Sequence, residues 1–295
     1  MVGEERGCEN QCGAGVERCS ERGWGPCEVP PSERSCENDC GSGVQTCTSN
    51  RWGECQVPTT FVECATACGE GREWCENGSW RPCDAPTPSP PVLRTTIRDF
   101  LDTHPDMELP GTGLYDGQGA VAEELDEDGK PVLIEMPWSI TSSESFSQWY
   151  RDVEGVNQSV EVDLQLEYSA SDNALFEYRS LAFFPIDGQL FGNQGRPHNY
   201  HFTLEAVTEF LYVGGEVFSF TGDDDLWVFI NDRLAIDLGG LHQSLSASVF
   251  IDDVAEQFGM QVGGLYPLVI FFAERHTLSS IFQIETSIAG PPQCN

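Results

Sequence analysis

The sequence predicts an all-β protein in which a β-sandwich head domain follows a small disulfide-rich repeat array. Three observations lead to this fold class. Cysteines recur at a fixed spacing in the first third of the chain, apolar and polar residues alternate in the rest, and helical patterns are few. The predicted parts are three disulfide-rich repeats over residues 1–84, a proline-rich linker over 85–94, the sandwich over 95–290 and a tail over 291–295.

The first part consists of three 28-residue units that each read C-x3-C-x6-C-x7-C. A unit this small cannot bury a sufficient apolar core, so two disulfides are expected to stabilise each unit. Four cysteines allow three pairings inside a unit, and their spacing does not choose among them. The twelve cysteines expected in disulfides are Cys8, Cys12, Cys19, Cys27, Cys36, Cys40, Cys47, Cys55, Cys64, Cys68, Cys75 and Cys83.

Glycine and tryptophan recur with the same period. A Gly-x-Gly follows each second cysteine and is expected to supply positive φ in a tight turn. One tryptophan per unit (Trp24, Trp52, Trp80) is expected to cover the disulfides. Zinc is the competing interpretation, but each unit has only one closely spaced cysteine pair and residues 1–84 contain no histidine. The C-x3-C-G-x-G-x3-C core loosely resembles thrombospondin type 1 repeats, and the array is expected to act as a stiff stalk or an assembly module.

The composition narrows the class of partner and the compartment. With 15 Lys and Arg against 48 Asp and Glu, the formal net charge is -33, which disfavours nucleic acid and anionic membranes as partners. No run approaches the roughly 20 apolar residues that span a bilayer. Thirteen cysteines indicate an oxidising compartment, so the protein is expected to be secreted or on the cell surface, with its signal peptide removed or replaced by Met1. Cys294 is expected to be a free thiol or an intermolecular link.

The linker and the head are distinguished by their residue patterns. Four prolines within residues 84–92 favour an extended polyproline II spacer. Helices are expected only at residues 97–101 and 143–150. Many short strands without intervening helices indicate a β-sandwich. Alternating segments, each predicting a strand with one exposed face, lie at residues 160–168, 245–251 and 282–288, and continuous apolar runs, predicting buried strands, lie at 226–230 and 268–273.

Three consecutive carboxylates, Asp223, Asp224 and Asp225, directly precede the apolar run at residues 226–230. Like charges this close repel one another, and burying them is costly unless a cation is present. Calcium takes six to eight oxygen ligands and would relieve this repulsion. The alternative is a solvated acidic turn, because such turns are abundant in a chain of this charge.

Several motifs in the head occur in an order that is similar to a known family. They are Ile97-Arg98-Asp99-Phe100 with His104-Pro105-Asp106, Trp149-Tyr150-Arg151-Asp152-Val153, Phe183-Phe184-Pro185-Ile186-Asp187, His198-Asn199-Tyr200-His201-Phe202, the segment 222–231, Asp237-Leu238-Gly239-Gly240-Leu241-His242 and Ala273-Glu274-Arg275-His276. Residues 95–289 thereby resemble the fibro-slime domain, which belongs with the protective-antigen-type β-sandwiches that include yeast flocculin adhesins.

The resemblance implies an extracellular β-sandwich associated with adhesion or a slime-like matrix. In flocculin-type relatives an Asp-Asp pair joined by a cis peptide binds calcium, and calcium in turn ligates sugar hydroxyls. The matching pair here is Asp223 and Asp224, and the second ligand loop would be residues 274–280. The metal ligands expected from the resemblance and the acidic triplet together are Asp223, Asp224, Asp225 and Glu274, with calcium as the cofactor.

Aromatic and histidine side chains complete the expected ligand site. Trp227, His242 and His276 are the candidate ligand-binding residues, because Trp227 lies beside the acidic loop and the two histidines could approach the Asp triplet in space. The alternative for the tryptophan is packing in the core, and for the histidines hydrogen bonding to loop backbone. Further aromatic residues that could stack on a sugar if they are exposed are Trp138, Trp149 and Tyr212.

The sequence favours a binding protein over an enzyme. It contains no Gly-x-Ser-x-Gly elbow, no phosphate-binding glycine loop and no His-Glu-x-x-His helix, so no catalytic residue is assigned. The leading hypothesis is an extracellular adhesion or surface-matrix protein whose head binds carbohydrate through calcium. The alternative is a structural subunit of an extracellular fibre that self-assembles through the repeats, and a hydrolase using Glu274 and His276 is the third.

Overall fold

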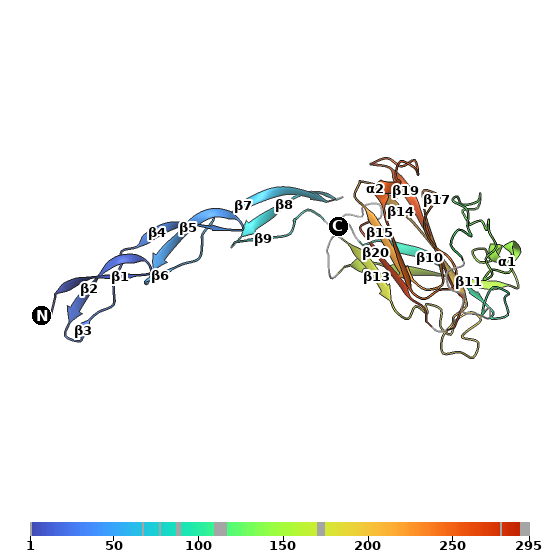
Figure 1. The fold of residues 1–295 in the computed structure, drawn as a ribbon, viewed down its shortest axis with the longest axis horizontal. Helices are drawn as coiled ribbons and strands as arrows, with labels where there is room; N and C mark the ends of the chain where they lie inside the picture. The colour runs from blue at the N-terminus through green and yellow to red at the C-terminus, as the bar shows by residue number, and fades with distance from the viewer. Residues whose placement is uncertain are drawn as a thin grey trace. The chain divides into compact units, whose positions relative to one another are not determined.

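The computed structural model describes residues 2–66, 68–76, 78–86, 90–108, 117–169, 175–277 and 279–289. The chain forms two compact units that divide between residues 87 and 88 (Figure 1). The N-terminal unit contains the repeats and the other unit is the head. Within the described residues, no helix is long and apolar enough to cross a membrane.

Each repeat folds into its own three-stranded antiparallel sheet, and the three sheets follow one another along the N-terminal unit (Figure 1). In each one a long hairpin is extended by a two-residue third strand, which pairs with the end of the second strand. The strands are β1 (Glu5–Asn10), β2 (Gly13–Ser20), β3 (Gly23–Trp24), β4 (Ser32–Asn38), β5 (Gly41–Thr48), β6 (Arg51–Trp52), β7 (Thr60–Thr66), β8 (Gly69–Glu76) and β9 (Ser79–Trp80).

The two glycines of each Gly-x-Gly have different physical roles. The first has positive φ, +119° at Gly13 and +115° at Gly41, as the sequence predicts for the hairpin turn. The second lies against the returning chain. A Cβ on Gly15 would come within 2.4 Å of the Glu28 carbonyl oxygen, and one on Gly43 within 2.3 Å of the Gln56 carbonyl oxygen. The second glycine is therefore required for close backbone packing rather than for its φ angle.

The disulfides join neighbouring repeats as well as closing each one. The first and fourth cysteines of each repeat are paired: Cys8–Cys27, Cys36–Cys55 and Cys64–Cys83. The second cysteine of one repeat pairs with the third cysteine of the next: Cys12–Cys47 and Cys40–Cys75. The expectation of two disulfides inside each unit is therefore wrong, because the hairpins are staggered and place the second cysteine beside the next repeat.

Ten of the twelve predicted cysteines form the five disulfides named above, which leaves Cys68 and Cys19. Cys68 is disulfide-bonded as well. Cys19 is free and half-buried, so its predicted disulfide is absent; it is the one free cysteine of the described residues. Cys294 lies outside the described residues.

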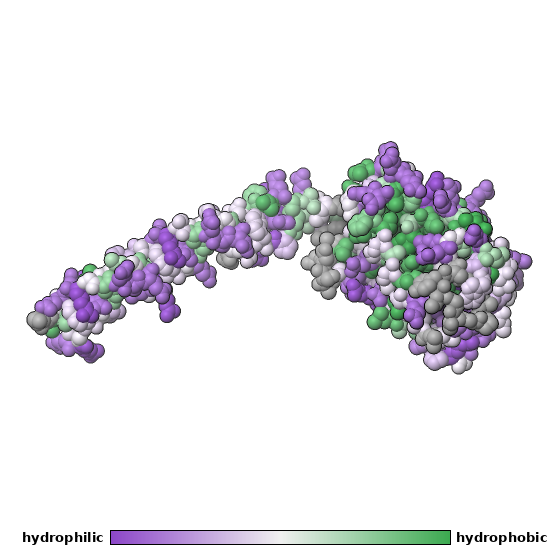
Figure 2. All heavy atoms as spheres, viewed as in Figure 1, coloured by the Kyte–Doolittle hydropathy of each residue, from purple (hydrophilic) through white to green (hydrophobic). Residues whose placement is uncertain are grey.

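The repeat tryptophans are partly exposed, and each lies across from the third cysteine of its repeat. Trp24 and Trp80 are 40% and 41% exposed. Arg6 and Arg34 place their guanidinium carbons 4.4 Å from the ring centres of Trp24 and Trp52. Figure 2 shows that hydrophilic residues cover most of this unit. With so little apolar surface buried, the repeats depend on their disulfides for stability.

The head is a β-sandwich of two antiparallel sheets, which confirms the predicted fold class. The first sheet has the order β11 (Asn157–Gln165), β10 (Val92–Phe100), β14 (Phe202–Leu211), β19 (Leu265–Glu274), β16 (Asp225–Ile230), β17 (Arg233–Leu238). The second has the order β12 (Glu167–Tyr168), β13 (Phe176–Ser180), β20 (Phe282–Thr286), β15 (Val217–Gly222), β18 (Leu245–Phe250). Two short helices complete the head, α1 (Ser143–Ser147) and α2 (Ile251–Val254).

Two sequence expectations near the start of the head need correction. The predicted linker 85–94 is shorter, since β10 begins at Val92 and Ala85 is buried against Gly71 of the third repeat. Residues 87–89 of that linker lie outside the described residues. The helix expected at residues 97–101 is wrong because the backbone there pairs with β11 on one side and β14 on the other.

The six-stranded sheet is buried on both faces along β16 and along most of β19. Its inner face packs on the second sheet through the main apolar core, to which β16 contributes Leu226, Val228 and Ile230. Its outer face carries Trp227 and Phe229, which pack with Phe146 and other apolar residues of the segment 117–153. Burial on both sides explains why the strands at 226–230 and 268–273 are continuously apolar.

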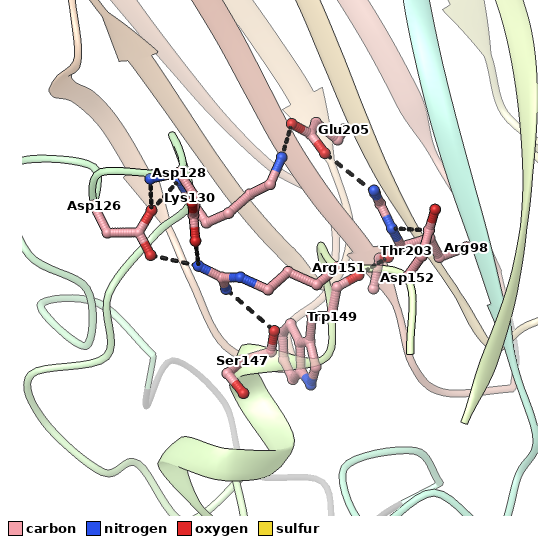
Figure 3. Close-up of polar contacts among 10 residues, drawn as sticks. All are labelled: Arg98, Asp126, Asp128, Lys130, Ser147, Trp149, Arg151, Asp152, Thr203 and Glu205. Atoms are coloured by element: carbon pink, nitrogen blue, oxygen red, sulfur yellow. Dashed lines mark hydrogen bonds and ion pairs between the residues drawn. The ribbon is translucent and has the colours of Figure 1, made fainter. Parts of the chain in front are cut away.

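A polar network fixes the segment 117–153 on the outer face of this sheet (Figure 3). Glu205 of β14 lies between two cations, with Arg98 Nη1 at 3.1 Å and Lys130 Nζ on its other oxygen. Arg98 also contacts Asp152 at 2.9 Å. Arg151 pairs with Asp126 and donates to the Ser147 carbonyl oxygen. These contacts hold the loop that reaches the end of the sandwich described next.

Candidate functional site: the acidic loop at one end of the head

The acidic triplet lies in the turn between β15 and β16, next to the end of β19 and the loop that follows it. The backbone amide of Arg275 donates to Asp224 Oδ2 at 3.0 Å, and the amide of Ile281 donates to Asp223 Oδ1 at 2.5 Å. Asp224 has a φ of +57°, which turns the chain sharply into β16. The fold therefore brings together the two loops that the sequence analysis expected to form one site.

The three aspartates point in different directions and have different partners. Both oxygens of Asp223 accept hydrogen bonds, from Ser279 Oγ at 2.7 Å and from the Ile281 amide. Asp225 is fully buried and accepts from the Gly240 amide at 2.7 Å and from Arg275 Nε at 2.6 Å. Asp223 thus closes the loop after β19, and Asp225 forms an internal ion pair.

Arg275 is the central cation of this end of the head, and the sequence analysis assigned it no role. Its side chain is fully buried and donates through Nη1 to the carbonyl oxygens of Ser139 at 2.7 Å and Asp106 at 3.1 Å. Its guanidinium carbon lies 4.6 Å from the ring centre of Trp149. The sequence feature that could have predicted this role is the charged Glu-Arg pair at the end of a long apolar strand. Charges at a buried strand end need partners of opposite charge.

The acidic side chains outnumber this one cation, and the pKa values of Asp224 and Glu274 are raised. Burial is the largest cause that raises the pKa of Asp224 to about 7, with Arg275 opposing it and Asp225 and Asp223 adding to it. Burial, then Asp224 and Asp223, raises the pKa of Glu274 well above its ordinary value. Glu274 Oε2 is buried and has no hydrogen-bond partner in the described residues. The cluster therefore favours a bound proton or cation.

The cluster fits a calcium ion in charge and donor type but only in part in its arrangement. Asp223, Asp224 and Glu274 supply the oxygen ligands that calcium prefers, and the free Glu274 oxygen is a ready donor. Within the described part of the chain, however, no three His, Cys, Asp or Glu side chains converge as a metal site would require. Asp225 is turned towards Arg275, and no described peptide bond is cis. A cation here would need additional oxygen ligands from outside these side chains.

Of the three predicted ligand-binding residues, Trp227 and His242 are buried, and His276 lies half-buried in the loop after β19. Trp227 is fully buried in the outer core, so its role as a sugar-binding residue is wrong. His242 is buried, with its ring nitrogens 2.9 Å from the carbonyl oxygens of Leu238 and Gln243. His276 is half-buried, and its Nδ1 lies 3.3 Å from the Thr277 carbonyl oxygen.

One predicted aromatic residue near the acidic loop is exposed. Trp138 is 48% exposed and immediately precedes Ser139, whose carbonyl oxygen accepts from buried Arg275. The other two aromatic candidates are buried: Trp149 packs in the outer core, and Tyr212 donates to Asp252 at 2.9 Å. Trp138 therefore offers an accessible ring, and the backbone contact of its neighbour attaches that segment to the acidic cluster.

Glu108 is a second residue of this region that the sequence analysis missed. Its carboxylate lies 3.0 Å from His201 Nε2 and accepts from the Thr277 amide at 3.1 Å, while its own amide donates to the Arg275 carbonyl oxygen. Burial alone would raise the pKa of Glu108, but the hydrogen bonds from His201 and Thr277 lower it below its ordinary value. Glu108 therefore supports the loop after β19 as an ionised side chain.

Comparison with known proteins finds similarity to one domain family within the head. The family model for the PA14 domain matches residues 191–293, which include the acidic loop and the end of β19. The match supports the protective-antigen-type part of the predicted resemblance, and the narrower fibro-slime assignment stays a prediction.

The chain also has curated relatives in Dictyostelium discoideum. It is 39% identical to Protein psiQ over 197 residues, which are 62% of this chain and 20% of psiQ. It is 37% identical to Protein psiD over 215 residues, which are 67% of this chain and 41% of psiD. The chain thus spans between about a fifth and two fifths of the length of these relatives.

Among solved structures, one similar chain is an epithelial adhesin A domain from Candida glabrata in complex with beta-lactose. The TM-score is 0.30 at 11% identity, covering 71% of this chain and 88% of the adhesin. The PA14 domain of an antifreeze protein gives a TM-score of 0.25 at 12% identity, covering 37% of this chain and 63% of that domain.

Proposed function

We propose that this chain is a non-enzymatic, extracellular adhesion protein whose head binds carbohydrate at the acidic end of the sandwich. The observation that carries the proposal is the PA14 match over residues 191–293, because the matched region contains the acidic loop and the strand end that closes it. The disulfides of the repeats support an oxidising, extracellular compartment.

The chemistry of this end suits a polyhydroxylated ligand. Carboxylate oxygens accept hydrogen bonds from sugar hydroxyls, and an exposed aromatic ring packs against the apolar face of a sugar. Asp224 is buried, but at 7% it has the largest exposed fraction of the four acidic side chains in the cluster, and Trp138 supplies the exposed ring. The partner of the head is accordingly a glycan of a cell surface or matrix.

Calcium is the proposed cofactor of this site, held by Asp223, Asp224 and Glu274. Its chemistry there would be to neutralise the excess carboxylate charge and to offer coordination positions to sugar hydroxyls. Support comes from the excess of carboxylates over Arg275 and from the unpartnered oxygen of Glu274. Water or ligand oxygens would fill the remaining coordination positions.

A glycan array tests the proposal with the whole chain, in calcium and in EDTA. We expect a defined set of glycans to bind in calcium, and Trp138→Ala to reduce that signal at least tenfold. Tyr168→Ala is the matched control, since Tyr168 is an aromatic residue of the head that is 38% exposed on β12 of the other sheet. Equal loss in both variants, or no glycan bound by the wild type, would contradict the proposal.

The second candidate function is a structural subunit that assembles through its repeats. The specific observation in its favour is that neighbouring repeats are joined covalently, by Cys12–Cys47 and Cys40–Cys75. The two functions are compatible because they use different units of the chain. Sedimentation under oxidising conditions tests for the structural function, since a fibre subunit should form large assemblies that disappear when the disulfides are reduced.

A further inference from the structure

One face of the third repeat differs from the same face of the first two repeats. Its hairpin, β7 with β8, carries Phe61, Arg72 and Trp74 on that face. The residues at the same places are Glu33, Val44 and Thr46 in the second repeat and Glu5, Val16 and Arg18 in the first. In the first repeat two of them form an exposed ion pair, with Arg18 Nε 2.9 Å from Glu5 Oε1. The fold of a repeat therefore accepts charged, polar or small aliphatic side chains here and does not require aromatic rings.

The position of the third repeat in the array does not explain this difference. The same face is open to solvent in the first two repeats, since Val16 is 37% and Val44 is 43% exposed. A following repeat does not cover the face in either case, so the third repeat has no additional surface to protect there. Aromatic side chains at exposed places where the fold accepts polar residues indicate a binding surface.

Asp84 fixes the tryptophan of this face. In the first two repeats the amide of Val16 or Val44 donates to a backbone carbonyl oxygen of the returning chain. In the third repeat the Arg72 amide donates instead to Asp84 Oδ1 at 2.6 Å, and the Trp74 indole N–H donates to Asp84 Oδ2 at 3.0 Å. These two hydrogen bonds lower the pKa of Asp84 below its ordinary value, so its carboxylate is ionised at neutral pH. Trp74 is thereby held in one orientation before a ligand arrives.

The aromatic rings lie beside an open cavity. Phe61 is exposed, and its ring centre is 5.1 Å from that of Trp74, with 48° between the ring planes. The guanidinium carbon of Arg72 lies 4.3 Å from the ring centre of Phe61. The cavity has a volume of about 590 Å³, and its lining includes Glu63, Glu70, Arg72, Trp74 and Asp84. All of its lining residues belong to the N-terminal unit, and its size suits a small ligand.

We propose that this face of the third repeat is a second carbohydrate-binding site, which takes neutral glycans without a metal ion. The aromatic rings offer a surface for the apolar face of a sugar. Glu63 and Glu70 accept hydrogen bonds from sugar hydroxyls, while Arg72 donates hydrogen bonds to sugar oxygens. Three carboxylates and one guanidinium line the cavity, and this excess of negative charge disfavours sialylated and sulfated glycans.

The site uses residues of the repeats only, so it is independent of the site proposed for the head. Two glycan sites on one chain make the second binding event intramolecular. Attachment to a surface covered with glycans is then tighter than either site provides alone, even where each site is weak.

The test compares forms of the whole chain that all carry Trp138→Ala and are kept in EDTA. The site proposed for the head then lacks both its calcium and its exposed ring. Phe61→Glu with Trp74→Thr gives the third repeat the residues with which the second repeat folds. The matched control, Glu33→Ala with Thr46→Ala, makes two substitutions at the same places of the second repeat.

A glycan array that carries neutral, sialylated and sulfated glycans is the probe. We expect neutral glycans to bind the Trp138→Ala chain and the matched control equally, and to bind the Phe61→Glu, Trp74→Thr variant at least tenfold more weakly. Peptide mapping of the Cys64–Cys83 bond under non-reducing conditions verifies that the third repeat is folded. Arg72→Val, which introduces the valine of the first two repeats, is a second variant and should also weaken binding.

Four results would overturn the proposal. The first is that no neutral glycan binds the Trp138→Ala chain, and the second is that sialylated or sulfated glycans bind it more strongly than neutral ones. The third is equal binding by this chain and by either third-repeat variant. The fourth is displacement of the glycan signal by a lysine-rich peptide at lower concentration than by free sugar, which would assign the cavity to a basic polypeptide instead.

Discussion

At the scale of single residues, the end of the head depends on one buried arginine among several acids. Arg275 bonds to Asp225 through its side chain and to Asp224 through its backbone, and it also holds the carbonyl oxygens of Ser139 and Asp106. Removing one partner of a buried ion pair leaves the other charge uncompensated, which costs more than the pair contributes.

Arg275→Met is therefore expected to lower the free energy of unfolding of the head by about 3–5 kcal/mol. Urea unfolding followed by tryptophan fluorescence measures the change. Arg179→Met is the control, because the side chain of Arg179 is 58% exposed and its ion pairs with Glu177 and Glu285 should contribute at most about 1 kcal/mol. Equal effects of the two substitutions would show that the buried pair does not stabilise the loop.

The raised pKa of Asp224 predicts how stability depends on pH. Its folded-state pKa of about 7 lies above the ordinary value of 3.8, so between these values the folded state binds the proton that the unfolded state releases. The stability contributed by that proton is fully present below about pH 4 and is lost as pH rises through 7. Without calcium, the urea concentration at the unfolding midpoint of the head should therefore decrease as the pH is raised from 5 to 7.5.

Asp224→Asn provides the comparison for this pH effect. Asn tolerates positive φ and can still accept the Arg275 amide, but it does not titrate. We expect a smaller fall in the urea midpoint between pH 5 and pH 7.5 for this variant, measured in EDTA. Glu274 retains part of the dependence, because burial raises its pKa as well. Identical pH profiles for variant and wild type would rule out Asp224 as the titrating group.

At the scale of strands and turns, the repeats are shaped by glycines that lie against the returning chain. A Cβ on Gly43 would come within 2.3 Å of the Gln56 carbonyl oxygen, a distance that real Cβ atoms do not reach. The fourth cysteine of the repeat, Cys55, immediately precedes Gln56, so any displacement of this backbone also displaces the Cys36–Cys55 bond.

Gly43→Ala is expected to yield protein in which Cys36 and Cys55 are unpaired or mispaired after oxidative folding. Peptide mapping under non-reducing conditions detects this. Gly53→Ala in the same repeat is the matched control, because its Cβ would stay 3.4 Å from the nearest atom, the Thr46 carbonyl oxygen. Native pairing in both variants would contradict the close-packing role of Gly43.

The elements differ in how far the sequence determined them. Alternation at 245–251 and 282–288 predicted β18 and β20, because one face of each strand packs on the core. Cysteine pairing was not predictable from the sequence. Because the repeat period is strict, the third cysteines of all repeats have the same sequence context, so the context does not show which of them pairs with a given second cysteine. The segment 97–101 is a strand because two neighbouring strands pair with it, and a local pattern does not contain that information.

The candidate site shows the same division between local and long-range information. Three consecutive acidic residues before an apolar strand marked the loop, and the fold places Arg275 and Ile281 beside it. The sequence did not show that Arg275 supplies the charge that balances Asp225, because the two residues are 50 positions apart. Trp227 was misassigned because the outer face of its strand is covered by the segment 117–153, which only the tertiary structure reveals.

At the scale of the whole molecule, the two units are stabilised by different means. The repeats bury little apolar surface and are joined by disulfides, while the head has an apolar core between its sheets and a second one on the outer face. Reduction should therefore unfold the repeats and leave the head folded. In a thermal scan, reductant should abolish the unfolding transition of the repeats and leave that of the head. Loss of both transitions would contradict this division.

The central claim is that the acidic end of the head binds carbohydrate, and titration calorimetry with the strongest glycan from the array tests it most directly. The whole chain is titrated in calcium as wild type and as Asp224→Asn, with circular dichroism showing that both are folded. We predict saturable binding by the wild type and at least tenfold weaker binding by the variant. Equal affinities of the two proteins would contradict the claim, because Asp224 would then lie outside the binding site.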